Sequence, residues 1–191
     1  MQVLKGKGFH IVYMLKMGST SLSRWPVREQ DLTRMSYPLE YFKNADPTDP
    51  IYAVWRPPLE RVISGVLTGL IVRSQSAKEP IEKHVAEWLR NPTVGKPGIT
   101  SHTKLVKNVY KKHDYQSWNW FHLSQLGSLH TYLNNKHGTS MKEVPKLNSH
   151  DSPQDLFFGE DWQNRYPKVI KMLREYVAND YIPENFLDLE D

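Results

Sequence analysis

Residues 9–22, FHIVYMLKMGSTSL, are the stretch on which the predicted fold depends. The first seven of them, 9–15, are mostly apolar, which is typical of a central parallel strand that is buried on both faces. Lys16, Gly18 and three hydroxyl residues follow at once, and one of the hydroxyls can cap a helix. Such a turn presents backbone N–H groups, hydroxyls and a cation to a bound anion. The stretch therefore predicts an α/β fold with an anion site at its first strand-to-helix turn.

The composition is that of a single globular domain that binds an anion. The chain of 191 residues is 39% hydrophobic and 24% charged, with a net charge of +4. This mild positive charge falls short of the clustered basic face of a dedicated nucleic-acid binder. The absence of cysteine excludes disulfides, thiol catalysis and thiolate metal sites. No apolar run reaches the roughly 18 residues of a membrane span and no signal-peptide pattern is present, so we expect a cytoplasmic protein without membrane contact.

A second strand-to-helix junction follows the first by about 40 residues. Residues 51–55, IYAVW, favour a strand, and the prolines at 57 and 58 end it and begin a helix. From residue 58 to about residue 73 the apolar side chains follow helical spacing. This helix is therefore expected to lie flat on the sheet.

The rest of the chain continues the alternation of strands and helices. The pattern predicts a strand at 118–123 and helices at about 79–90, 102–112, 124–137 and 162–181. This order predicts a three-layer, P-loop-like α/β fold with a mainly parallel central sheet flanked by helices. No repeat or linker divides the chain, so one domain over 1–191 is expected.

Both junctions resemble the cofactor motifs of sulfotransferases that use 3′-phosphoadenosine 5′-phosphosulfate (PAPS). Residues 15–22, LKMGSTSL, resemble the 5′-phosphosulfate loop of that family, which usually has the form P-K-[TS]-G-[GST]-[ST]-[ST]-L. Residues 52–66, YAVWRPPLERVISGV, resemble the 3′-phosphate motif, a strand followed by R-D-P-x-x-R-x-x-S and a helix. Arg56 and Ser64 stand eight positions apart, as that motif requires, and a pair so placed can reach one phosphate.

Three shorter stretches resemble the Golgi-type carbohydrate sulfotransferases. They are residues 113–118, 144–149 and 179–181, so that the resemblance runs from about residue 9 to residue 181. Leu15 and Pro57 depart from the two main motifs, where the family has proline and aspartate. The resemblance implies a divergent, compact member that acts on a carbohydrate. Without a membrane anchor or cysteines, the chain is expected in a bacterial or viral setting.

The resemblance also implies a role for each motif residue. PAPS would be the cofactor, its sulfuryl group would pass to a hydroxyl or amine of a small-molecule or glycan acceptor, and the bisphosphate PAP would remain. Lys16 would hold the bridging oxygen and stabilise the leaving phosphate. The 3′-phosphate would be held by Arg56 and Ser64, and the 5′-phosphate by Gly18, Ser19, Thr20 and Ser21. This chemistry needs no metal, and the histidines offer no close ligand pair on one helix face.

The acceptor hydroxyl also needs a general base. Family members use a histidine or a carboxylate, usually between the two motifs, where this chain offers Glu29 and Asp31. His113 lies further along the chain and ranks behind them. The residues alone do not decide among the three.

Two other classes of function stay open at this stage, and so does the oligomeric state. A small P-loop-type nucleotide kinase would carry G-x-x-x-x-G-K-[ST] and a magnesium-binding acid, whereas here the lysine precedes the glycine. A non-catalytic nucleotide or nucleic-acid binder would use basic residues and exposed tryptophans. A sulfotransferase-like protein that binds the cofactor without transferring it is a variant of the main hypothesis.

Overall fold

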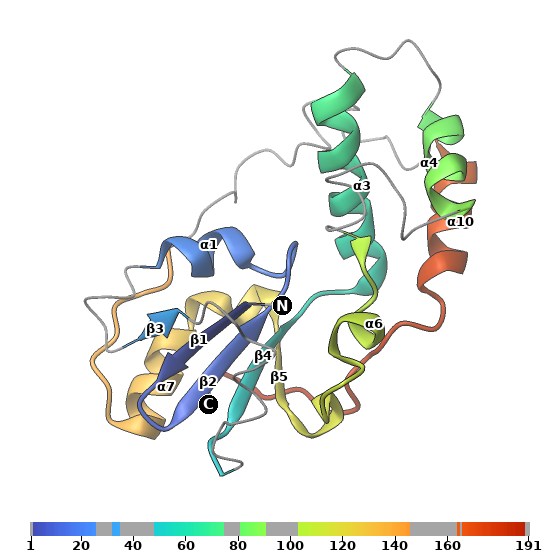
Figure 1. Ribbon diagram of the computed structural model, residues 1–191. Helices are drawn as coiled ribbons and strands as arrows, with labels where there is room; N and C mark the ends of the chain where they lie inside the picture. Colours follow the sequence, from blue (N-terminus) through green and yellow to red (C-terminus); the bar gives the residue numbers. More distant parts are fainter. Residues whose placement is uncertain are drawn as a thin grey trace. The chain divides into compact units, whose positions relative to one another are not determined.

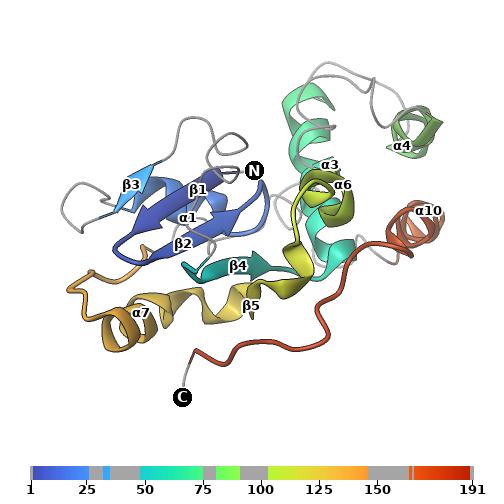
Figure 2. The ribbon, with the colours of Figure 1, turned by 60° about the horizontal axis from the view of Figure 1, so that its bottom comes forward.

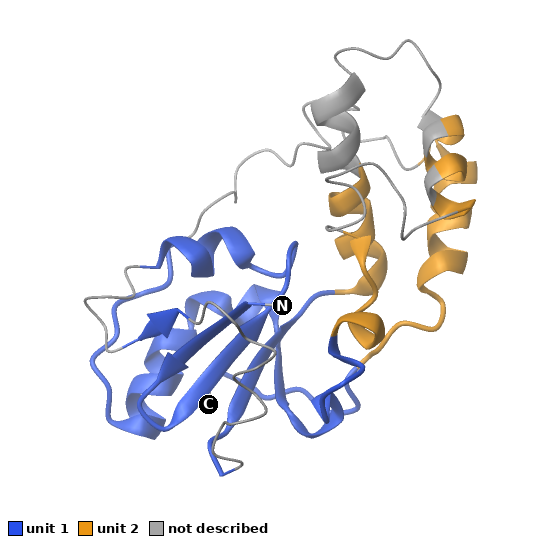
Figure 3. Cartoon of the chain, in the orientation of Figure 1, with its two compact units in different colours: residues 1–56, 110–147, 183–191 blue, residues 57–109, 148–182 orange. Residues whose placement is uncertain are grey.

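The computed structural model describes residues 2–25, 32–34, 48–74, 81–90, 103–145, 164 and 166–189. The chain divides into two compact units, each built from several segments (Figure 3). Unit 1 holds residues 1–56, 110–147 and 183–191, and unit 2 holds residues 57–109 and 148–182. The expectation of one domain over the whole chain stays a prediction.

Unit 1 is built on a five-stranded sheet with the strand order β3-β1-β2-β4-β5 (Figure 1). Its helical segments are α1 (Ser19–Arg24), the two 3₁₀ turns η2 (Tyr115–Ser117) and η3 (Leu123–Gly127), and α7 (Leu129–His137). The strands are β1 (Gln2–Gly6), β2 (Phe9–Tyr13), β3 (Thr33–Arg34), β4 (Ile51–Trp55) and β5 (Asn119–His122).

The α/β class is confirmed, but the sheet is mixed rather than mainly parallel. β4 pairs in parallel with β2 and with β5, whereas β1 pairs antiparallel with β2 and β3. The difference comes from the first residues of the chain, which form a hairpin with β2. Gly6 pairs with Phe9, and Gly8, with φ of +75°, allows the tight turn between them.

β2 is the central strand that its apolar run predicts. All five of its residues are buried, and β1 and β4 pair with its two edges. The strand ends at Tyr13, two residues before the predicted end. β4 has the predicted bounds, and its last four residues are buried as well.

α7 packs on one face of the sheet in unit 1 (Figures 1 and 2). The ring of His137 stacks at a tilt on Phe9, with 4.7 Å between the ring centroids. The hydroxyl of Tyr52, on β4, lies 2.9 Å from Nε2 of His137. Tyr132 adds an edge-to-face contact with Tyr52 at 5.9 Å. The packing of α7 on the sheet therefore includes a partly buried hydrogen bond between His137 and Tyr52, in which either group can donate.

We expect the protein to lose thermal stability as the pH falls from about 7 to about 5.5, through the usual histidine pKa. Burial lowers the pKa of His137 and of His10, and the opposing effect of Asp49 on each is smaller. The unfolded chain therefore binds more protons than the folded protein in this range, so stability falls with the pH. Differential scanning fluorimetry measures this change.

The control for the pH effect is His137→Gln, which does not titrate. Glutamine can still bond the Tyr52 hydroxyl, so the melting temperature of this variant should depend less on pH than that of the natural protein. Equal slopes for the two proteins would show that His137 is not part of the effect.

Unit 2 is helical in its described residues. Its helices are α3 (Pro58–Ser74), α4 (Ile81–Arg90), α6 (Val106–Tyr110, whose last residue belongs to unit 1) and α10 (Pro167–Val177). α10 packs against both α3 and α4. The predicted helical spacing of α3 is confirmed at its first half, where the core residues of this unit include Val62, Ile63 and Val66. Their partners in that core are Val85, Val169, Ile170 and Leu173.

None of the described helices is long and apolar enough to cross a lipid bilayer.

Candidate functional site

The loop that follows β2 has an unusual backbone. Lys16 has φ of +66° and Gly18 has φ of +71°, so both occupy the left-handed region. For a lysine this conformation costs about 1–2 kcal/mol, and such strain is often found at functional sites. The N–H of Met17 donates to the carbonyl of Met14 at 3.1 Å, and the Met17 side chain is buried, which fixes the turn.

The predicted phosphate donors follow this loop on α1. Gly18 occupies the N-cap position, and the N–H of Leu22 donates to its carbonyl at 2.9 Å. Ser19 and Thr20 are partly exposed, whereas Ser21 is buried. Two of the three hydroxyls are therefore accessible in the first turn of α1, beside the strained lysine.

Arg56 lies at the same end of the sheet as the Lys16 loop, the carboxyl end of the parallel strands. It follows β4 directly, and β4 is the parallel neighbour of β2. Since the carboxyl ends of parallel strands lie at the same end of a sheet, the Lys16 loop and Arg56 extend from that end of the sheet. The structure thus brings together the residues predicted for the 5′-phosphosulfate and the first residue predicted for the 3′-phosphate.

Lys16 and Arg56 lie close enough for their charges to interact. Burial is the main cause that lowers the pKa of Lys16, and the positive charge of Arg56 lowers it further. Both side chains are partly exposed. Two cations that repel each other at the end of a sheet are stabilised when an anion binds between them, because it offsets the repulsion of both charges.

Gly18 packs against the turn that follows β5. A Cβ atom placed on Gly18 would lie 2.9 Å from Cδ2 of Leu126 and 3.1 Å from Cδ1 of Leu123. Both leucines belong to η3, which follows β5 at the same edge of the sheet. Three segments, each following one of the parallel strands, therefore meet at this edge.

Gly18→Ala is expected to lower the free energy of unfolding by about 1–2 kcal/mol from the backbone alone. The contact with Leu126 adds to this loss, because the leucine must shift to admit the new methyl group. Chemical denaturation followed by circular dichroism measures the change. Gly138→Ala is the matched control, since Gly138 has φ of +61° and open space around it. An equal loss of unfolding free energy in both variants would show that contact with η3 adds nothing to the effect at Gly18.

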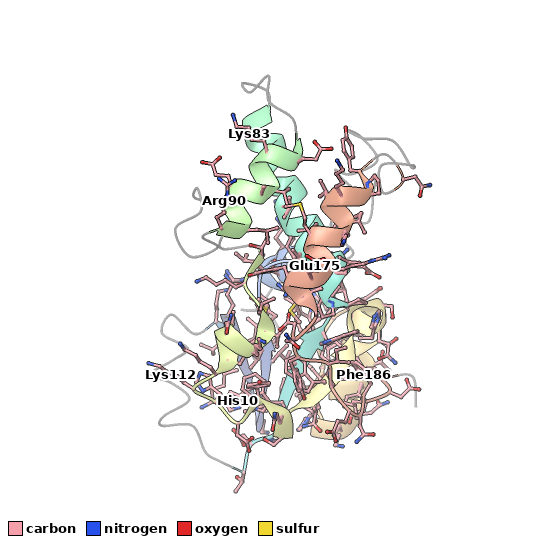
Figure 4. All side chains as sticks on the ribbon, turned by 90° about the vertical axis from the view of Figure 1, so that its right-hand side faces the viewer. His10, Lys83, Arg90, Lys112, Glu175 and Phe186 are labelled. Carbon is pink, nitrogen blue, oxygen red and sulfur yellow. The ribbon has the colours of Figure 1, made fainter. Side chains whose placement is uncertain are left out.

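An aromatic cluster that the sequence did not predict lies beside Arg56. Trp55 and His122 are paired residues on β4 and β5, with 5.6 Å between their rings. Phe186, labelled in Figure 4, packs edge-on against Trp55 at 5.0 Å and is 43% exposed. The N–H of Ser124 donates to Nδ1 of His122 at 3.2 Å, which places the proton of a neutral His122 on Nε2. The cluster is reached from solvent through Phe186 and the partly exposed His122, whereas Trp55 is buried.

Ser64 lies in unit 2, on α3, and is partly exposed. Arg56 is the last residue of the first segment of unit 1. The joint binding of one phosphate by Arg56 and Ser64 therefore stays a prediction from their spacing.

The general base also stays a prediction. Glu29 and Asp31 lie outside the described residues. His113 lies in unit 1 between α6 and η2, and burial lowers its pKa, which favours the neutral form that a base requires. Its ring lies 6.2 Å from that of Trp118, which is buried as the sequence predicts.

Unit 2 contains a charged pair that the sequence did not predict. Arg61 and Asp180 are fully buried, with 2.8 Å between Nη2 and Oδ2. Arg61 stands within the 3′-phosphate motif and Asp180 within residues 179–181, but the resemblance gave neither a partner. In the described part of the chain, no three histidine, aspartate or glutamate side chains are grouped as a metal ion would require.

Comparisons with protein-family models, with curated proteins and with solved structures find no match to this chain.

Proposed function

We propose that this protein is a PAPS-dependent sulfotransferase that acts on a hydroxyl or amine, most simply that of a carbohydrate. The observation that supports this function best is the coupling of Lys16 and Arg56. They follow adjacent parallel strands, Lys16 is held in a strained conformation, and the charge of Arg56 adds to burial in lowering the pKa of Lys16. The two motifs that resemble the family each supply one of these cations.

The residues present suit a phosphorylated, sulfated nucleotide. Lysine, arginine and short hydroxyl side chains are the donors that bind phosphate and sulfate oxygens. The left-handed conformation of Gly18 turns the loop directly into α1, and the first backbone N–H groups of a helix have no acceptor within the helix and can donate to such a group. When bound, PAPS supplies the sulfuryl group that the acceptor oxygen or nitrogen takes from the 5′-phosphate oxygen.

In this function the chain's own residues position groups and stabilise charge. Lys16 would donate to the oxygen on which negative charge develops, and the accessible hydroxyls of Ser19 and Thr20, with the backbone N–H groups of the loop and of the buried Ser21, would orient the 5′-phosphate. Arg56 would hold the 3′-phosphate, and the spacing of the motif predicts the same role for Ser64. A base, for which Glu29, Asp31 and His113 are the candidates, takes the proton of the acceptor.

A three-layer, P-loop-like architecture accompanies this proposal. It is supported by the parallel order β2-β4-β5 and by the position of Lys16 after the first of these strands. In this interpretation β1 and β3 are an antiparallel addition to the outer side of β2.

Ligand-induced stabilisation tests the proposal. Adenosine 3′,5′-bisphosphate should raise the melting temperature in the presence of EDTA, since no metal is needed to hold it. If ATP with magnesium stabilises the protein and the bisphosphate does not, the protein is better described as a nucleotide kinase. If an oligonucleotide binds as well after Lys16→Ala, a nucleic-acid binder is the better description.

Arg56→Ala is expected to weaken binding of the bisphosphate by about 1.5–3 kcal/mol, the range for a hydrogen bond to a charged group. This corresponds to a rise of roughly 10- to 150-fold in the dissociation constant, which isothermal titration calorimetry measures. Arg24→Ala is the control, because Arg24 is exposed at the end of α1 and the same charge is lost. An unchanged affinity in Arg56→Ala would remove Arg56 from the 3′-phosphate site.

A further inference from the structure

His122 is the last residue of β5, and its backbone neighbours belong to both phosphate segments of unit 1. In the parallel pair of β4 and β5 it stands opposite Trp55, the residue that directly precedes Arg56. The residue after it, Leu123, packs on the turn of the Lys16 loop, because a Cβ atom placed on Gly18 would lie 3.1 Å from Cδ1 of Leu123. All of these residues lie in unit 1. The fold therefore places His122 at the carboxyl end of the parallel strands, where the candidate site is.

The imidazole of His122 is held by three neighbours. The N–H of Ser124 donates to Nδ1 at 3.2 Å, and the Ser124 hydroxyl lies 2.7 Å from the same nitrogen. The rings of Trp55 and Phe186 lie 5.6 Å and 6.5 Å from the imidazole, measured between ring centroids. In the part of the chain that the structure describes, the hydrogen bonds of this ring all go to Nδ1. Nε2 therefore carries the proton of the neutral ring, and the partly exposed side chain keeps this donor for a ligand or for water.

The capping of η3 explains one nitrogen of His122 but not the other. His122 is the N-cap residue of η3, since its side chain accepts the N–H of Ser124. Asparagine, aspartate and serine are the usual residues for such a cap. Histidine adds a second nitrogen, further from the backbone, which the cap fixes as a donor. In this tautomer Nε2 can bind an anion, whereas it has no lone pair with which to act as a base.

We propose that His122 is a further ligand of the bound nucleotide, and that its Nε2–H donates to an oxygen of the 5′-phosphate. The 5′-phosphate is favoured over the 3′-phosphate because the segment of His122 packs on the Gly18 turn through Leu123. A hydrogen bond to a charged oxygen is shorter and stronger than one between neutral groups. This inference rests on the proposed function, to which it adds a binding residue that neither phosphate motif contains.

Two substitutions separate the roles of the two ring nitrogens. In His122→Asn the amide oxygen can take the place of Nδ1 and accept the N–H of Ser124, but no atom reaches the position of Nε2. In His122→Gln the longer side chain brings an amide N–H close to the position of Nε2, while the acceptor of the cap is lost. A role in capping alone and a role in binding therefore predict opposite results for this pair.

Isothermal titration calorimetry with adenosine 5′-phosphate and adenosine 3′,5′-bisphosphate tests the proposal. We expect His122→Asn to raise both dissociation constants by about tenfold or more, the loss of one hydrogen bond to a charged group. Its melting temperature should stay near that of the natural protein. His122→Gln should bind both nucleotides more tightly than His122→Asn does, even though its melting temperature is lower.

The failure of the proposal differs from the failure of the function on which it rests. If the natural protein does not bind the bisphosphate, the proposed function is refuted. If the natural protein binds it and His122→Asn binds it equally well, His122 is only a cap and the function still stands. A loss of affinity for the bisphosphate alone would also overturn the proposal, because His122 would then act at the 3′-phosphate.

Nitrogen NMR of the histidine rings gives a second measurement, which does not depend on the stability of His122→Asn. Saturation with the bisphosphate should shift the Nε2 signal of His122, identified by its absence from the spectrum of His122→Gln. If no imidazole with its proton on Nε2 changes its signal at saturation, the nucleotide does not bind His122.

Discussion

Lys16→Ala is expected to slow sulfuryl transfer by about 100- to 1,000-fold or more, the effect of removing one donor that stabilises transition-state charge. Lys16 is the cation that follows the central strand, and its strained backbone holds it in the turn that precedes the hydroxyl residues. No other side chain of the loop carries a charge. The release of the bisphosphate from PAPS in the presence of acceptor measures the rate.

The same substitution should leave the fold intact and can raise its stability. Burial and Arg56 both lower the pKa of Lys16, so the folded protein disfavours the charged lysine at neutral pH. Alanine removes that cost and keeps the left-handed residue as strained as before. We therefore expect a melting temperature equal to or above that of the natural protein, together with the loss of transfer.

Two variants make this expectation specific. Lys112→Ala removes the same charge from an exposed residue of the same unit, labelled in Figure 4, and should leave transfer unchanged. Lys16→Arg keeps the charge and should recover part of the rate. If Lys16→Ala transferred sulfuryl groups within a few-fold of the natural rate, Lys16 would not be the group that stabilises the leaving phosphate.

The elements that the sequence predicts well are those whose signal is local. The apolar run of β2 and the helical spacing of α3 lie within a few turns of chain, so their patterns are visible without a partner. β1 is not predicted, because QVLKG has too few apolar residues to be recognised as a strand. Only its pairing with β2 makes it one. That pairing is also what turns a predicted parallel sheet into a mixed one.

The candidate site, too, is predictable from the sequence only in part. Motif order places Lys16 and Arg56 after two strands, and parallel pairing then brings those strand ends to one edge. The left-handed conformation of Lys16 is not predictable, because lysine has no preference for it. His122 and Phe186 reach Trp55 only through the pairing of β5 and the path of the last residues, where the N–H of Leu187 donates to the carbonyl of Trp120 at 2.7 Å.

The contact between Arg61 and Asp180 shows most clearly what the sequence alone does not predict. They are 119 residues apart, and a single sequence holds no information that joins them. An arginine beside the apolar stripe of α3 is ordinarily expected to reach water. Its burial becomes understandable only when the carboxylate after α10 and the carbonyl of Lys104 are in place.

Arg61→Met alone is expected to lower the free energy of unfolding by about 3–5 kcal/mol, the usual loss when one partner of a buried ion pair is removed. The methionine fills much of the same volume, so the loss comes from the uncompensated charge of Asp180 and not from a cavity. The carbonyl of Lys104 also loses its donor. Urea denaturation followed by circular dichroism gives the difference, and Asp180→Asn alone should be destabilising for the converse reason.

The double variant R61M/D180N then decides what the pair contributes. It leaves no buried charge, so its stability should return most of the way to that of the natural protein. A double variant as unstable as the two single changes combined would mean that the directed bonds, and not the balance of charge, hold unit 2 together.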